Sequence, residues 1–78
     1  MNIEHLVAMV NDISHYFAAE PDSAAGVEGV ATHLKRYWEP GMRKQIVAYL
    51  AAGGEGLEPL GKKGVERLAE LDAKPLGA

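Results

Sequence analysis

Hydrophobic residues recur along this chain with the helical period of about 3.6 residues, and no segment alternates with the period of two that is typical of a strand. The first periodic segment predicts a helix over residues 3–19. Its apolar side chains share one side of that helix: Ile3, Leu6, Val7, Met9, Val10, Ile13 and Phe17. Ser14 falls on the same side, and we expect its hydroxyl to donate a hydrogen bond to the backbone carbonyl one turn earlier.

Pro21 and Asp22 separate this helix from the next one. Pro21 disfavours helical backbone at the residue before it, and Asp22 is a suitable N-cap for a second helix that begins near Ser23 and stops at Glu39. The side chains predicted to face the core from this helix are Val27, Val30, Ala31, Leu34, Tyr37 and Trp38.

Two further helices follow. Pro40 suits the first turn of a helix over residues 40–52, and the segment "GGEG" at 53–56 ends it. The fourth helix opens at Glu58-Pro59, and its sequence places Lys62 with Glu66 and Glu70 with Lys74 at the i, i+4 spacing of surface ion pairs. We therefore predict an all-α fold, one domain over residues 1–78 that forms a small bundle of three or four antiparallel helices, with a frayed tail over about 73–78.

Composition changes this picture by suggesting a partner. A chain of 78 residues without cysteine has neither disulfides nor a thiolate metal site, and its three histidines lack the spacing of zinc ligands. Because so small a core gives little stability alone, a partner protein is the simplest source of more, and the same small core is compatible with self-association of the isolated chain. The amino terminus resembles neither a signal peptide nor a membrane span, so we expect a cytoplasmic location and no membrane contact.

Charge is unevenly distributed. The first 34 residues contain five acidic side chains and no Lys or Arg, whereas residues 35–44 contain Lys35, Arg36, Arg43 and Lys44 against Glu39. In a chain with a net charge of −3, this basic island suits an acidic protein surface better than nucleic acid. No glycine-rich phosphate loop or catalytic constellation is present, so we do not expect an enzyme.

The segment "HLKRYWEPGMRKQI" contains the candidate partner-binding residues. These are His33, Tyr37, Trp38, Pro40, Met42 and Arg43. Trp38 is expected to anchor the core while keeping one edge at the rim. Arg43 falls on the apolar side of the third predicted helix, where its guanidinium needs an acceptor, and a carboxylate or carbonyl pair on a partner would suit it.

Three segments, "LVAMVNDISHYF", "HLKRYWEPGMRKQI" and "GGEGLEPL", together resemble the delta subunit of soluble NAD-dependent formate dehydrogenases over about residues 3–72. The residues that carry the most specific part of the resemblance are His33, Tyr37, Trp38, Glu39, Pro40, Met42 and Arg43. Gly41 departs from the family pattern, which commonly has Arg there, and this lowers the positive charge at the corner.

The resemblance implies a non-catalytic accessory subunit that docks on the large catalytic subunit and supports its assembly, cofactor retention or stability. The molybdenum or tungsten pterin, the iron-sulfur clusters, FMN and NAD would then reside on partner subunits and none on this chain. Two alternatives stay open: a transient assembly chaperone, and a small helix-turn-helix module in which the basic residues around Pro40 bind nucleic acid.

Overall fold

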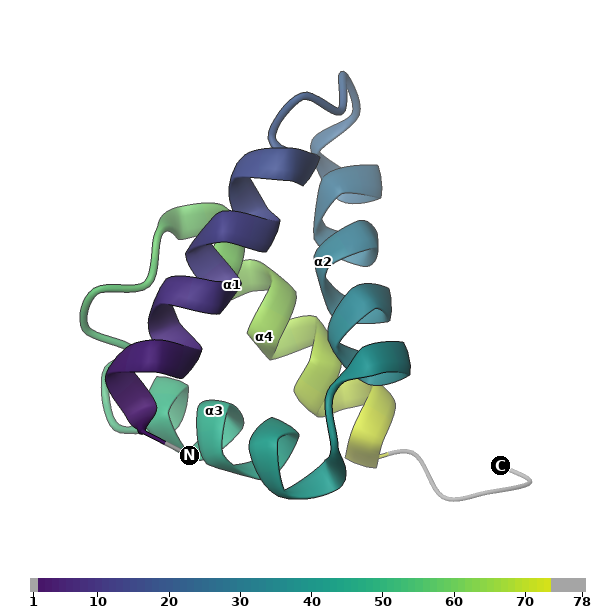
Figure 1. Cartoon of the computed structure of the whole chain (residues 1–78). Helices are drawn as coiled ribbons and strands as arrows, with labels where there is room; N and C mark the ends of the chain where they lie inside the picture. Colours follow the sequence, from purple (N-terminus) through teal and green to yellow (C-terminus); the bar gives the residue numbers. More distant parts are fainter. Residues whose placement is uncertain (1, 74–78) are drawn as a thin grey trace.

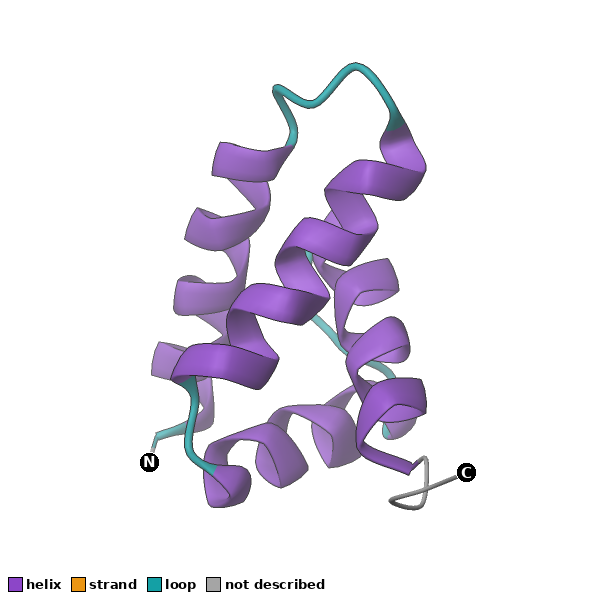
Figure 2. Ribbon diagram, turned by 90° about the vertical axis from the view of Figure 1, so that its right-hand side faces the viewer, coloured by secondary structure: helices purple, strands orange, loops and turns teal. Residues whose placement is uncertain are grey.

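The computed structural model describes residues 2–73 and contains four helices and no strand within that range (Figure 1). They are α1 (Ile3–Phe17), α2 (Ser23–Tyr37), α3 (Pro40–Ala51) and α4 (Pro59–Ala73). α1 and α2 run in opposite directions from a short loop, α3 lies across their far ends, and α4 packs behind both (Figures 1 and 2). The all-α prediction is confirmed.

The predicted starts of the helices hold because the capping residues act as expected, whereas α1 and α2 each end two residues before the predicted end and α3 ends one residue before it. The Asp22 side chain accepts a hydrogen bond from the backbone N–H of Ala24 at the start of α2, and Pro40 occupies the first turn of α3. Asn2 caps α1 in the same way, through the N–H of Glu4. α4 continues to Ala73, and the rest of the predicted tail, residues 74–78, lies outside the described residues.

A single apolar core joins the four helices. Its buried hydrophobic side chains are Leu6, Val10, Val30, Ala31, Leu34, Trp38, Ile46, Leu57, Val65 and Leu68. Ser14 is buried beside them, and its hydroxyl donates a hydrogen bond of 2.8 Å to the carbonyl of Val10, as predicted. This bond satisfies the one polar side chain that the described core contains.

One core prediction is wrong at the end of α2. Tyr37 is 70% exposed, whereas its neighbour Trp38 is only 5% exposed. The reason is that the helix ends at Tyr37, two residues before the predicted end, and Trp38 takes an extended conformation that turns its ring into the core. Tyr37, still on the helix, is left on the outer surface.

Glycines set how closely α4 approaches the other helices. A Cβ at Gly64 would lie 2.3 Å from Cγ1 of Val30 on α2, and one at Gly61 would lie 2.9 Å from the Ser14 hydroxyl oxygen on α1. Real Cβ atoms do not approach that closely, so both contacts require a residue without one. The two glycines that weaken the helical propensity of α4 are therefore the residues that allow it to pack.

The loop before α4 is held by Asn11, a residue that the sequence pattern did not single out. Its side-chain amide donates to the carbonyl of Gly56 at 2.9 Å and accepts from the N–H of Glu58 at 3.0 Å. On the next turn of α1, Nε2 of His15 lies 2.5 Å from Oε2 of Glu58, within hydrogen-bonding distance, while the His15 side chain remains well exposed. α1 thus fixes the start of α4 by polar contacts as well as by packing.

The ion pairs on α4 differ from those predicted. No ion pair joins Lys62 to Glu66 within residues 2–73, and the pair of Glu70 with Lys74 falls outside the described residues. Instead, Arg67 bridges Glu28 on α2 and Glu70 on its own helix. Arg67 reaches both because α2 and α4 lie side by side.

Candidate partner-binding surface

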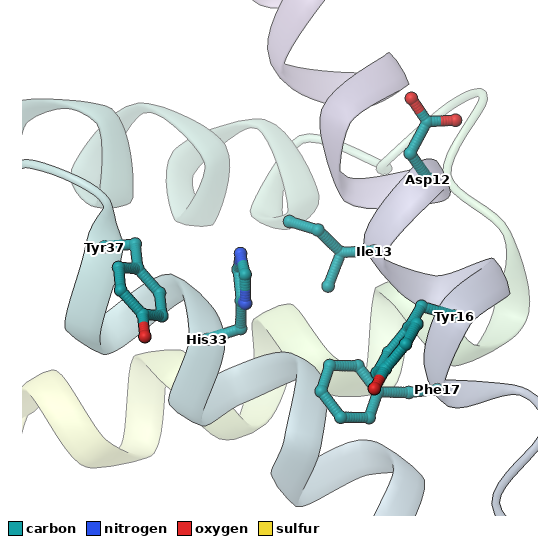
Figure 3. A pocket seen from close by; sticks show the side chains of 6 residues that line it. All are labelled: Asp12, Ile13, Tyr16, Phe17, His33 and Tyr37. Atoms are coloured by element: carbon teal, nitrogen blue, oxygen red, sulfur yellow. The ribbon is translucent and has the colours of Figure 1, made fainter.

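An open groove runs between α1 and α2. It is lined by Asp12, Ile13, Tyr16, Phe17, His33 and Tyr37, and we call it the aromatic groove (Figure 3). Tyr16 is 76% exposed. Among residues 2–73, Tyr16 and Tyr37 are the two large hydrophobic side chains that lie exposed. Two such rings on the same face of a small domain are typical of an interaction surface.

The rings of the groove support one another. Tyr16 and Phe17 meet edge to face, with their ring centroids 4.9 Å apart. The ring centroids of His33 and Tyr37, which are one turn apart on α2, are separated by 4.8 Å. Phe17 crosses to α2 and lies against Gly29, where a Cβ would come within 2.4 Å of the ring. Because Gly29 has no side chain, the Phe17 ring lies directly on the backbone of α2. The ring forms part of the floor of the groove.

Four of the six candidate residues from the sequence are gathered at this surface. A hollow beside the aromatic groove includes His33, Tyr37, Trp38 and Met42 together with Met9 of α1. Pro40 is exposed at the corner between α2 and α3. The structure thus brings together the end of α2, the start of α3 and the middle of α1, of which the sequence analysis had proposed only the first two for binding.

Arg43 points away from this surface. Its Nε donates to Oδ2 of Asp72 on α4 at 3.0 Å, and its Nη1 donates to the carbonyls of Trp38 at 2.8 Å and Lys35 at 3.3 Å. The acceptors that the sequence analysis sought on a partner are therefore present within the chain. A partner contact of Arg43 stays a prediction, but its guanidinium already caps the end of α2 and ties it to α4.

The basic island is partly neutralised by the same carboxylate. Lys35 also forms an ion pair with Asp72, so two of the four cations share one acceptor. Arg36 and Lys44 remain exposed. The helix-turn-helix alternative depended on four free basic residues around Pro40, and the structure leaves only these two of them without an ion-pair partner among residues 2–73.

Comparison with known families identifies the chain. A family model described as the NADH-dependent formate dehydrogenase delta subunit FdsD matches residues 5–65. The chain belongs to this family. The match includes every residue of the aromatic groove as well as Trp38, Met42 and Arg43, and it confirms the resemblance drawn from the sequence. Comparisons with curated proteins and with solved structures give no significant match.

Two further findings concern this member of the delta-subunit family. Residues 2–73 contain no group of three or more His, Cys, Asp or Glu side chains that could hold a metal ion. The same residues include no helix of the length and apolar character needed to span a membrane.

Asp72 has an unusual electrostatic environment in this family member. Partial burial raises the pKa of its carboxyl, but the hydrogen bonds and charges of Lys35 and Arg43 lower it by more, so its pKa lies below the ordinary value. The folded state therefore holds the Asp72 proton less tightly than the unfolded chain does. It follows that the ionised carboxylate stabilises the fold, and that protonation removes this contribution.

Acidification is expected to reduce the contribution of Asp72 to stability. Because the pKa of Asp72 is lowered on folding, the contribution is complete above about pH 4, the unfolded value, and is lost as the pH falls further through the folded value. The measurement is the free energy of urea unfolding of the wild type and of Asp72→Asn over this range. The difference between the two should be constant near neutral pH and shrink in acid, whereas a difference that stays constant into strong acid would contradict this role.

The sequence analysis did not single out Tyr16 or Asp12 as candidate binding residues, and it placed Ile13 and Phe17 in the core. Both of the latter are only partly buried and pack against the core from the groove side. A signal was present, because Tyr16 lies three residues after Ile13 and therefore widens the apolar side of α1 beyond the width that one core contact requires. An apolar arc wider than the core needs is the feature that could have located the groove.

Proposed function

We propose that this chain is a non-catalytic accessory subunit that docks on the large catalytic subunit of a cytoplasmic NAD-dependent formate dehydrogenase. The observation that carries the proposal is the family match over residues 5–65, since a subunit family implies other subunits with which the chain assembles. The exposed aromatic side chains between α1 and α2 support a role in binding.

The chemistry of the complex is assigned to its other subunits. In this proposal the molybdenum or tungsten pterin, the iron-sulfur clusters, FMN and NAD are held there. The chain has no cysteine, so it has no thiolate with which to ligate a cluster. Its hollows are shallow surface features on a four-helix domain, and their linings are dominated by apolar side chains. These features suit a binding role better than a catalytic one.

Docking would stabilise both partners. A small domain gains stability when a partner binds only its folded form, and the large subunit gains the surface that the domain covers. We therefore propose that the chain supports assembly of the large subunit, retention of its cofactor, or stability of its active form. Loss of the chain should lower the yield or lifetime of active enzyme without changing the chemistry of its active site.

Co-expression with a tagged large catalytic subunit tests this proposal. We expect the chain to copurify with the large subunit through size-exclusion chromatography. Its absence from an otherwise intact tagged complex would overturn the proposal. Stoichiometry of the purified holoenzyme separates the two forms of the role, because a permanent subunit is present at one copy for each large subunit and a transient assembly chaperone is present in immature enzyme only.

A further inference from the structure

The aromatic groove is unlike the rest of the surface in that its largest side chains lie exposed without a packing reason. The rings of Tyr16 and Tyr37 stand on opposite sides of the groove, one on α1 and one on α2 (Figure 3). Leaving two tyrosine rings in water forgoes burial that the same residues provide in a core or an interface. The groove floor between them, made by Ile13 and Phe17, is only partly buried.

The chemistry of the groove restricts what can lie in it. Both of its sides are helices, so the groove presents no sheet edge to which an extended segment could add. A segment that buries its own backbone against apolar rings must satisfy its polar groups by itself. An α-helix does so, and it would present side chains at i, i+3, i+4 and i+7 to the rings.

Charge adds a requirement on the occupant. Asp12 lines the groove beside Ile13, is exposed, and forms no hydrogen bond or ion pair within the described chain. It belongs to the first 34 residues, which contain no Lys or Arg to neutralise it. Arg36 of α2 does not line the aromatic groove, and it lines instead a neighbouring hollow that shares Phe17, His33 and Tyr37 with the groove. A cationic side chain on the occupant, next to its apolar stripe, would therefore complement Asp12.

We propose that the aromatic groove is the docking site for an amphipathic helix of the large catalytic subunit, with apolar side chains between Tyr16 and Tyr37 and an Arg or Lys facing Asp12. This inference rests on the proposed function and adds to it the surface and the kind of segment that binds. It places the basic island outside the main contact, because Lys35 and Arg43 are engaged with Asp72.

Copurification of variants with the tagged large subunit tests the surface. Tyr16→Ala and Tyr37→Ala should each weaken the complex by about tenfold or more, as expected for truncated aromatic anchors, while leaving the thermal unfolding midpoint of the chain nearly unchanged. Asp12→Lys should also weaken binding. Its matched control is Glu66→Lys, which makes the same change in net charge at an exposed position on α4 and should bind like the wild type.

Photo-crosslinking identifies the occupant. With p-benzoylphenylalanine in place of Tyr16, which keeps an aromatic ring at this exposed position, the expected crosslink is to a helical segment of the large subunit that contains an Arg or Lys. A crosslink to a second copy of this chain, or to an extended or acidic segment, would overturn the proposed occupant. If the wild type copurifies but both tyrosine variants bind equally well, the groove proposal fails and the accessory-subunit proposal stands. If the wild type itself does not copurify, both fail.

Discussion

Gly64→Ala is expected to destabilise the domain by about 2 kcal/mol, although alanine is the better helix former. Alanine would favour the helical state of α4 by about 1 kcal/mol. Against this, its Cβ would lie 2.3 Å from Cγ1 and 2.7 Å from Cβ of the buried Val30, and relieving such an overlap in a packed core costs about 1–3 kcal/mol or more. Because Val30 is β-branched and fully buried, it has little freedom to move away.

A double-mutant cycle shows whether the overlap with Val30 is the cause. Val30→Ala alone should cost about 2 kcal/mol through the space that it leaves. In the double variant, the methyl groups that clash are gone, so the total loss should be smaller than the sum of the single losses by about 1 kcal/mol or more. Rescue should be partial, since the Cβ of residue 30 remains close to the new methyl group. Additive losses would contradict the close approach of α2 and α4.

Gly41→Ala is the matched control. Gly41 lies in the first turn of α3, is exposed, and a Cβ there would meet no atom within 4 Å. The same substitution should therefore stabilise the domain by about 0.5–1 kcal/mol. Thermal or urea unfolding followed by far-UV circular dichroism measures all four variants, and opposite signs at Gly64 and Gly41 would show that packing, not helix propensity, decides the effect.

The sequence predicted the helices because local signals mark their ends. Pro21 and Asp22, Pro40, and the glycines after α3 act through the chain on either side of them, so their effect can be deduced without knowing what packs where. The buried positions of α1 and the middle of α2 followed from periodicity for the same reason. Gly54, which has a φ of 64°, belongs to the segment "GGEG" that the sequence predicted to end the third helix.

What the sequence did not predict depends on contacts between distant segments. Whether Tyr37 or Trp38 enters the core depends on the exact residue at which α2 ends, and helical periodicity does not fix that to one residue. The glycines of α4 are unfavourable for helix formation by themselves. Their benefit depends on the close packing of α1 and α2 against them, which helical periodicity does not reveal. The acceptors of Arg43 lie eight or fewer residues back in the chain and on Asp72, 29 residues ahead, a combination that only the folded chain brings together.

Arg43→Ala is the second change with a large expected effect, a loss of about 2–3 kcal/mol in the free energy of unfolding. The substitution removes three hydrogen bonds, leaves the carbonyl of Trp38 without its guanidinium donor, and leaves Asp72 with Lys35 as its one remaining cation. The Arg43 side chain is only 16% exposed, so water does not readily replace it. Arg43→Lys should lose less, because a lysine keeps the charge but lacks the planar fork that reaches both α2 and α4.

Comparison of stability with binding decides whether Arg43 also contacts a partner. Arg36→Ala is the control, an exposed arginine on α2 for which unfolding should change by less than about 0.5 kcal/mol. If Arg43→Ala lowers the unfolding free energy and the yield of the complex together, its role is to hold α2, α3 and α4 in the arrangement that shapes the aromatic groove. If it lowers complex yield and leaves unfolding unchanged, the structural role is wrong and the partner contact predicted from the sequence is correct. The contacts to Asp72 and Trp38 favour the first outcome, because a guanidinium with three acceptors in its own chain has few donors left for another.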